Sequence, residues 1–156
     1  MDVTLSWYEM LHGAHVGALR LVQVIEEHRQ PTHGQQGYNW HNAIEGTMAE
    51  LAVAKGLDLY WAGIVGDFKA PDVGPLQVRY TDRPTGHLLL HKSDKDEDLC
   101  VFVIGSFGKY RLVGWCQIGT VKRDEFWRDP TGSRPCYFVP QSALNPMEEL
   151  TKDKYL

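Results

Sequence analysis

Apolar residues in the first third of the chain recur at helical spacing. Leu11, Ala14, Ala18, Leu21 and Ile25 follow one another at intervals of three or four residues. This stripe predicts an amphipathic helix over residues 4–29. The segment "PTHGQQGYN" that follows is rich in Pro, Gly and Asn and predicts a loop.

A second helix is expected from Trp40 to Lys55, ended by Gly56. Its residues are small or apolar on nearly every side, as in "AIEGTMAELAVA". A helix that is apolar all round is usually buried, so this one is expected between two layers of the fold.

From residue 76 onward the pattern changes to the two-residue period of strands. Leu76, Val78 and Tyr80 alternate with Gln77 and Arg79, and further strands are predicted at residues 87–91, 99–105, 109–118 and 136–140. Helices followed by a run of strands indicate an α+β fold, with N-terminal helices packed on a mixed, mostly antiparallel β-sheet. The length of 156 residues predicts a single domain over residues 1–156.

Composition narrows the range of functions. The chain is 43% hydrophobic and 23% charged, which is typical of globular proteins, and its formal net charge is -4. A negative chain is not expected to bind bare nucleic acid tightly without a metal ion, low salt, oligomerisation or a partner. The three cysteines form no C-x-x-C pair, which argues against a zinc knuckle or a disulfide framework. The start "MDVTLSWYEM" lacks a signal-peptide pattern, so a cytoplasmic protein is expected.

Glu50 is the first candidate for chemistry, because it lies in the middle of the small, apolar second helix. A carboxylate there is costly unless it is paired or binds a metal ion. Two explanations stay open: a structural ion pair with Arg20 or Arg79, or a metal ligand. Glu45 falls on another side of the helix beside His41, where an exposed pair is expected.

The stretch "APDVGPLQVRY" holds the other candidates. Asp72 precedes a Gly-Pro turn, where aspartate is common for local hydrogen bonding alone. Gln77 and Arg79 lie two residues apart on a strand and therefore share one face. A polar strand face explains them singly, but an acid followed by this pair also resembles a site for a metal ion and a phosphate.

The run "GTMAELAVAKGL", then "PD", then "QVR", resembles the PD-(D/E)XK nuclease superfamily, which has the restriction-endonuclease-like fold. The wider sequence is similar to phage and prophage proteins of that type. The resemblance implies a metal-dependent nuclease with Mg²⁺ or Mn²⁺, a nucleic-acid substrate with DNA favoured over RNA, and a bacterial host cytoplasm.

Carried over residue by residue, the resemblance implies that Glu50 is the helix acid and that Asp72 is the central metal-binding aspartate. Gln77 stands at the (D/E) position, Arg79 stands where lysine is usual, and the backbone carbonyl of Val78 completes the metal shell.

Two departures from the superfamily pattern keep an alternative open. Gln77 is neutral and contributes less to binding a divalent cation, and Arg79 cannot serve as a general base. The alternative is a catalytically inactive module of the same fold that binds nucleic acid or a protein partner. Asp67 is a second choice for the metal aspartate. The long first helix also offers a surface for a homodimer.

Other clusters of polar residues are weaker candidates for a functional site. His87 and His91 lie on one strand face but too far apart to share an ion, and "KSDKDED" is expected to be a solvated hairpin tip. Trp127, among Lys122, Arg123 and Arg128, most simply packs at a layer interface, with base stacking as the less favoured reading.

Overall fold

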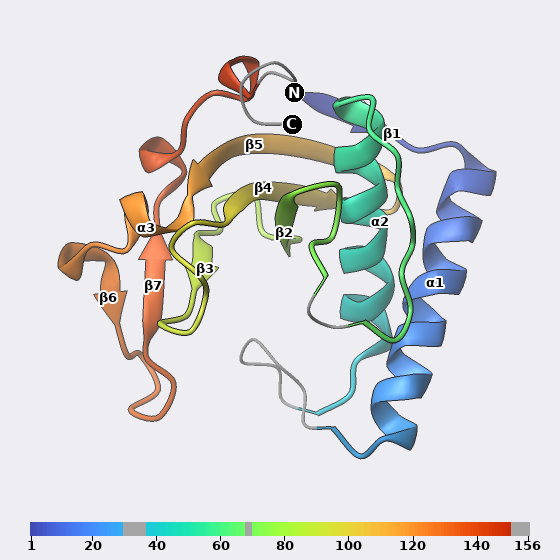
Figure 1. The fold of residues 1–156 in the computed structure, drawn as a ribbon, viewed down its shortest axis with the longest axis horizontal. Helices are drawn as coiled ribbons and strands as arrows, with labels where there is room; N and C mark the ends of the chain where they lie inside the picture. The colour runs from blue at the N-terminus through green and yellow to red at the C-terminus, as the bar shows by residue number, and fades with distance from the viewer. Residues whose placement is uncertain (30–36, 68–69, 151–156) are drawn as a thin grey trace.

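The computed structural model describes residues 1–29, 37–67 and 70–150 (Figure 1). Helices and strands follow one another in these ranges as β1 (Asp2–Thr4), α1 (Trp7–Glu26), α2 (Trp40–Gly56), β2 (Leu76–Thr81), β3 (Leu88–Leu90), β4 (Leu99–Ser106), β5 (Lys109–Gln117), α3 (Ile118–Val121), η1 (Asp124–Phe126), β6 (Trp127–Arg128), β7 (Cys136–Val139), η2 (Gln141–Ala143) and η3 (Met147–Glu149). The fold is α+β, as the pattern predicts.

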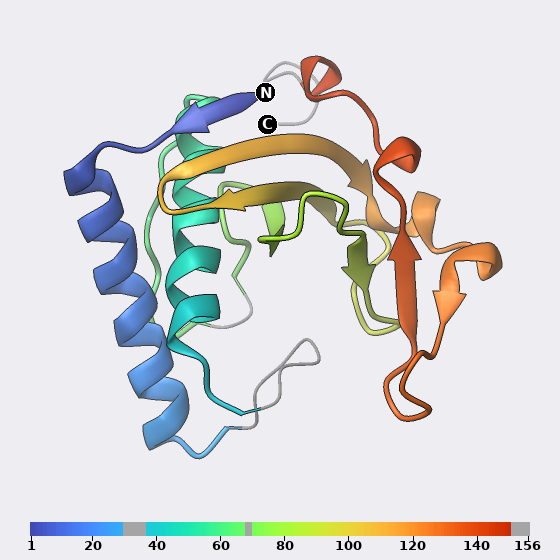
Figure 2. The same cartoon turned by 180° about the vertical axis from the view of Figure 1, so that it is seen from behind.

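The strands form two sheets that are visible from both sides (Figures 1 and 2). A four-stranded sheet has the order β1-β5-β4-β2, and a three-stranded sheet has the order β3-β7-β6. Strands β2 and β4 are parallel, whereas the other pairings are antiparallel. The mixed, mostly antiparallel character is confirmed, but the division into two sheets was not expected from the sequence.

Helix α1 begins at Trp7 rather than at residue 4, because Ser6 forms a capping box with Glu9. The Ser6 hydroxyl accepts from the backbone of Glu9, and the Glu9 carboxylate accepts from the Ser6 backbone N–H at 2.6 Å. The residues before Ser6 join the sheet instead, as β1 beside β5. At the other end the helix stops at Glu26, and residue 30 lies outside the described residues.

Helix α2 lies between α1 and the four-stranded sheet, as its apolar surface predicts (Figure 1). Ala49, Ala52 and Val53 are completely buried. A Cβ atom on Gly17 of α1 would lie 2.7 Å from the carbonyl oxygen of Ala43, so this glycine allows the two helices to approach closely. This packing fixes the position of Glu50, which α2 carries.

Strand β4 separates two hydrophobic cores. Val101 and Val103 belong to the core beneath α2, whereas Cys100, Phe102 and Ile104 belong to the core shared with the three-stranded sheet. Successive side chains of a strand point to opposite faces, which explains the alternation. Both faces of the four-stranded sheet are therefore covered.

Strand β2 forms one border of the four-stranded sheet, with β4 as its neighbour. Its other edge faces the space between α2 and the three-stranded sheet (Figure 1). Among the described residues, no helix is both long enough and apolar enough to cross a bilayer.

The expected exposed pair of Glu45 and His41 is wrong, because Glu45 is only 3% exposed. The Glu45 carboxylate accepts the Tyr110 hydroxyl at 2.6 Å and the backbone N–H of Phe107 at 3.2 Å. Phe107 lies between β4 and β5 and has a positive φ of 51°. Glu45 thus fastens the β4–β5 turn to α2, a contact over more than sixty residues that helical spacing does not reveal.

Replacing Glu45 by Gln is expected to lower the free energy of unfolding by about 2 kcal/mol, because a neutral amide with one oxygen replaces a carboxylate that accepts from both donors. Denaturant unfolding measures the loss. The control is Glu26→Gln, an exposed carboxylate at the end of α1, which is expected to change stability by less than about 0.5 kcal/mol. Equal effects of the two substitutions would contradict the anchoring role of Glu45.

Candidate functional site

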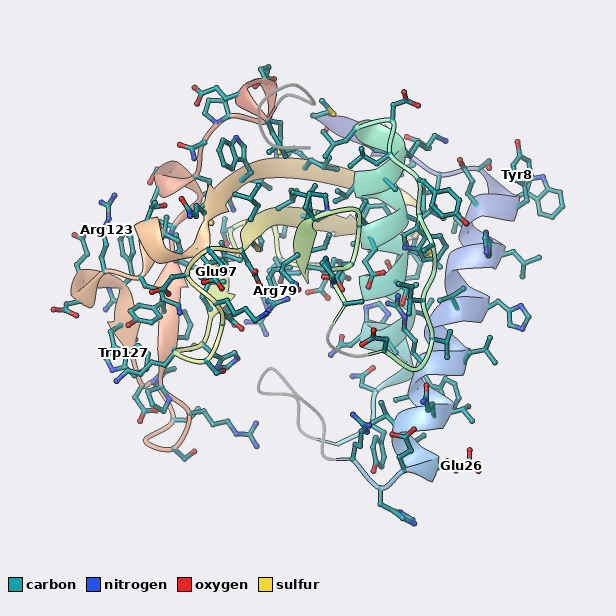
Figure 3. All side chains as sticks on the ribbon, in the orientation of Figure 1. Tyr8, Glu26, Arg79, Glu97, Arg123 and Trp127 are labelled. Atoms are coloured by element: carbon teal, nitrogen blue, oxygen red, sulfur yellow. The ribbon has the colours of Figure 1, made fainter. Side chains whose placement is uncertain are left out.

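A cleft of about 800 Å³ runs along the open edge of β2. Asn42 and Glu50 of α2 line one side, and His87 and His91 line the other. Strand β2 contributes further lining residues, among them Arg79. Figure 3 shows Arg79 in the middle of the molecule, between α2 and the three-stranded sheet, whereas Tyr8 and Glu26 lie on the outer side of α1.

Asp72 reaches the edge of β2 from a tight turn. The turn is closed by hydrogen bonds of the Asp72 and Val73 N–H groups to the carbonyl of Leu76, at 3.0 and 3.1 Å. Its Oδ2 atom then accepts the backbone N–H of Val78 at 2.7 Å. Asp72 therefore satisfies a strand donor that has no neighbouring strand on this side in the described part of the chain.

Glu50 is 7% exposed, and both of its oxygens accept hydrogen bonds. Oε1 accepts from Arg20 Nη1 of α1 at 2.6 Å, and Oε2 accepts from Trp61 Nε1 at 3.3 Å. Arg20 is held in turn by its Nε atom, which donates to the carbonyl of Ile64 at 2.7 Å. The ion pair with Arg20, one of the two explanations for a buried acid here, is therefore present.

The carboxylates of Glu50 and Asp72 lie close enough for their charges to interact. Burial, and after it the negative charge of Asp72, raise the pKa of Glu50 to about 7 against the lowering effect of Arg20 and Trp61. Burial also raises the pKa of Asp72, although the Val78 N–H and the charges of Arg79 and Arg20 oppose the rise. Two neighbouring acids that both resist ionisation mark this end of the cleft.

Arg79 is loosely held. Its Nη1 atom donates to the carbonyl of Val78 and its Nη2 atom to Asp94 Oδ1, both at the long distance of 3.4 Å. Its Nε atom is buried and has no hydrogen-bond partner among the described residues. Weak contacts and an unused donor leave this guanidinium able to bind an added anion.

Gln77 lies on the same face of β2 as Arg79 and is paired with Cys100 of β4. Its amide makes no hydrogen bond with another described residue. The structure therefore brings together Glu50, Asp72, Val78 and Arg79, whereas no hydrogen bond among the described residues joins Gln77 to the two carboxylates. The predicted ligand role of Gln77 stays a prediction.

Two further predicted ligands are already engaged. The carbonyl of Val78 accepts from Arg79, and Asp67, the second choice for the metal aspartate, accepts the backbone N–H of Ala70 at 3.3 Å. Their predicted roles as ligands likewise stay predictions.

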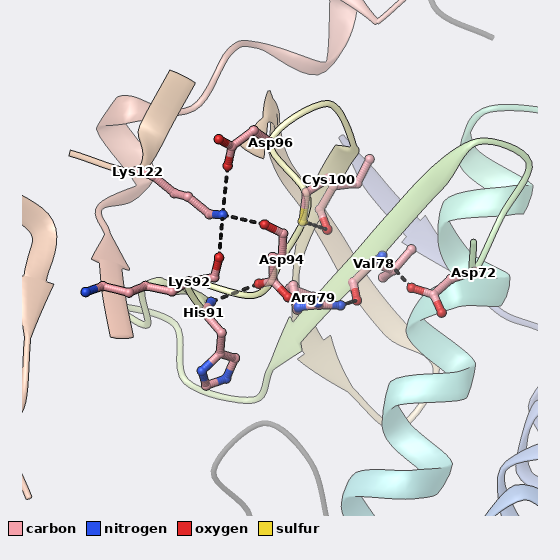
Figure 4. A network of polar contacts seen from close by, with 10 residues as sticks. Asp72, Val78, Arg79, His91, Lys92, Asp94, Asp96, Cys100 and Lys122 are labelled. Carbon is pink, nitrogen blue, oxygen red and sulfur yellow. Dashed lines mark hydrogen bonds and ion pairs between the residues drawn. The ribbon is translucent and has the colours of Figure 1, made fainter. Parts of the chain in front are cut away.

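The acidic segment "KSDKDED" is not simply a solvated tip, because Lys122 orders it (Figure 4). Lys122 Nζ donates to Asp96 Oδ1 at 2.8 Å and to the carbonyls of Lys92 and Asp94. Asp94 in turn accepts the His91 N–H at 2.9 Å and faces Arg79. Lys122 lies 26 residues from Asp96, so no local pattern in the sequence predicts this network.

The acidic residues beside the cleft provide only some of the ligands that Mg²⁺ requires. Mg²⁺ is commonly held by one or two carboxylates, and it keeps several waters and takes oxygens from substrate phosphates. Glu50 and Asp72 supply two carboxylates, and Arg20 competes with a cation for Glu50. No group of three or more His, Cys, Asp or Glu side chains in the described part of the chain is arranged to hold a metal ion.

Comparison of the chain with models of known protein families, with curated proteins and with solved structures finds no match. Two mutually repelling carboxylates and one loosely held arginine are the distinguishing features of the cleft.

The pKa of Glu50 predicts how stability depends on pH. The ordinary value is 4.5 and the folded value is about 7, so the folded protein binds this proton more tightly than the unfolded chain does. The stabilising contribution is complete below pH 4.5 and is lost as the pH rises to about 7.

Relative to Glu50→Gln, which cannot ionise, the wild type is therefore expected to lose up to about 3 kcal/mol of unfolding free energy across this pH range. Denaturant unfolding of both proteins at several pH values measures the difference. A difference that does not change with pH would contradict the raised pKa of Glu50.

Proposed function

We propose that this protein is a metal-dependent nuclease with a restriction-endonuclease-like fold, which hydrolyses phosphodiester bonds of nucleic acid, DNA before RNA. The observation that carries the proposal is the buried approach of Glu50 and Asp72 beside the cleft, with Arg79 on the neighbouring strand. This arrangement agrees with the roles that the sequence resemblance implies for these three residues.

The electrostatics of the acid pair support a cation site. Burial raises the pKa of both carboxylates, and the charge of Asp72 raises that of Glu50 further, so the ionised form of the site is destabilised. A divalent cation between them would relieve this repulsion, which a structural ion pair with Arg20 alone does not. Strongly perturbed acids in a cleft are typical of functional sites.

Each residue then has a defined task. Glu50 and Asp72 would hold Mg²⁺ or Mn²⁺, which when bound supplies Lewis-acid stabilisation of phosphate charge and lowers the pKa of water. Arg79 would exchange its long contact with Asp94 for a phosphate oxygen and stabilise the charge that develops there. Arg79 stays protonated, so it can orient the phosphate and neutralise its charge, but it cannot accept a proton from the attacking water.

Arg20 is a positioning residue in this proposal. It holds Glu50 from α1 at 2.6 Å and lowers the pKa of that carboxylate against the effect of burial. The ion pair thereby keeps a fraction of Glu50 ionised near neutral pH and fixes one of its oxygens. The other oxygen makes only a 3.3 Å contact with Trp61 and is easier to redirect.

A second function is favoured by one specific observation, namely that both oxygens of Glu50 already have donors. In that case the acid is structural, and the cleft belongs to a catalytically inactive module that binds a phosphate-containing partner through Arg79. The neutral Gln77 agrees with this alternative. Metal binding separates the two functions, because only the nuclease requires it.

Asp72→Asn is expected to weaken binding of Mg²⁺ and Mn²⁺ by at least about tenfold and to abolish cleavage, because it removes one of the two ligand charges. The amide oxygen still accepts the Val78 N–H, so the fold should be retained. Isothermal titration measures the affinity, and incubation with plasmid and single-stranded DNA measures cleavage.

The matched control is Asp124→Asn in η1, an exposed acid outside the cleft, which should leave both properties at wild-type levels. A wild-type protein that neither binds the two metals nor cleaves DNA would contradict the nuclease proposal and support the inactive module.

Arg79→Gln is expected to separate metal binding from catalysis. The metal affinity should stay about the same, because Arg79 carries no ligand oxygen, whereas kcat for oligonucleotide cleavage should fall by about 10²- to 10³-fold. Arg79→Lys, which keeps the charge, should retain more activity than Arg79→Gln. A parallel loss of metal affinity and cleavage in Arg79→Gln would mean that Arg79 supports the site only structurally.

A further inference from the structure

We infer that the cleft along β2 binds one strand of nucleic acid rather than a double helix, with Arg83 and His87 on its outer wall contacting the phosphates. The inference rests on the proposed function, because it names the substrate class of the same site. Four observations support it: the distribution of charge, the size of the cleft, its apolar surface and the state of Arg79.

Most of the basic groups of the cleft lie on one wall. Arg79 and Arg83, together with the imidazoles of His87 and His91, line the cleft from β2 and residues 82–91, where Asp82 is the one carboxylate among the described lining residues, whereas Glu50 lies on the α2 side. Arg83 and His87 are exposed. In a chain with a net charge of -4, this wall is a local concentration of groups that bind phosphate.

The size of the cleft favours a single strand. A volume of about 800 Å³ is within the range that encloses a small molecule, which is the scale of one or a few nucleotides. Duplex recognition instead relies on an exposed helix or ribbon in a groove and on a broad basic surface. Here the helix beside the cleft, α2, is buried between α1 and the sheet, and the chain is acidic overall.

The wall also offers surface to an unstacked base. Phe138 of β7 and Leu89 line the cleft, and Leu89 is 40% exposed. His87 meets Phe138 edge to face, with ring centroids 6.3 Å apart. Rings beside cationic side chains are the usual means of holding single strands, because every base has a face that stacks.

Arg79 connects this wall to the acid pair. Its two contacts are 3.4 Å long and its buried Nε has no partner among the described residues, so an incoming phosphate improves its hydrogen bonding. Until a phosphate binds, the guanidinium of Arg79 is held by Asp94, which lies in the loop that Lys122 orders. A strand that enters along Arg83 and His87 therefore meets Arg79, whose charge acts on Asp72.

Fluorescence anisotropy of the full chain tests the inference, with a labelled oligonucleotide of about 12 nucleotides and with its duplex, in EDTA so that no cleavage occurs and in a salt series that starts at low salt. The single strand is expected to bind at least about tenfold more tightly than the duplex. Arg83→Gln should weaken single-strand binding and lower the slope of log K against log salt by about 0.7. Arg111→Gln, an exposed arginine on β5, is the matched control and should change neither.

Equal or tighter binding of the duplex would overturn the inference, and so would Arg83→Gln with wild-type affinity and slope, or no binding of the single strand. Failure of the proposed function would look different. Metal-dependent cleavage of duplex DNA without single-strand preference would overturn only the inference. Single-strand binding with the expected Arg83 effect, in a protein that cleaves nothing with Mg²⁺ or Mn²⁺, would overturn only the nuclease.

Discussion

The repulsion between the buried carboxylates of Glu50 and Asp72 is the constraint around which this end of the molecule is arranged. Burial and the charge of Asp72 hold the pKa of Glu50 near 7, although Arg20 lowers it. Three separate elements are needed to maintain the arrangement. Helix α2 supplies Glu50, α1 supplies Arg20, and the turn before β2 supplies Asp72. The packing of the two helices on the sheet thus holds the carboxylates of Glu50 and Asp72 close together beside the cleft, although their charges repel.

The open edge of β2 and the candidate site are the same piece of structure. An unpaired strand edge exposes backbone donors and acceptors that invite association with other chains. Here Asp72 occupies the N–H of Val78 and Arg79 occupies its carbonyl. Asp72 and Arg79, the residues proposed to act on a phosphodiester, therefore also protect the strand edge. A substrate phosphate that binds Arg79 would release the carbonyl of Val78 from this protection.

Patterns of local spacing predicted much of the fold. The period of α1 and α2 and the alternation of β2, β4 and β5 follow from side-chain direction alone, and all these elements are present. The Glu50–Arg20 pair was also foreseen, because a buried acid needs a partner and Arg20 was one of two candidates. What local pattern does not encode is the pairing of distant segments, such as the parallel approach of β2 to β4 and the separation of a second sheet.

Contacts between distant segments also explain why the surroundings of some side chains differ from the prediction. Glu45 looked exposed because its helical neighbours are polar on one side, yet Tyr110, 65 residues away, covers it. Lys122 orders the acidic segment from a comparable distance. The position of Asp72 at the start of β2 follows from a local signal, a Pro-Asp step before a turn and a strand, whereas its role as a metal ligand stays a prediction.

The most direct test of this account is an NMR titration of the Glu50 side-chain carboxyl with and without Mg²⁺. The account predicts that the pKa of Glu50 is about 7 in the absence of metal and falls when Mg²⁺ is added, because a cation between the acids favours their ionised forms. A Glu50 carboxyl that titrates near its ordinary value of 4.5, or whose pKa does not respond to Mg²⁺, would contradict it.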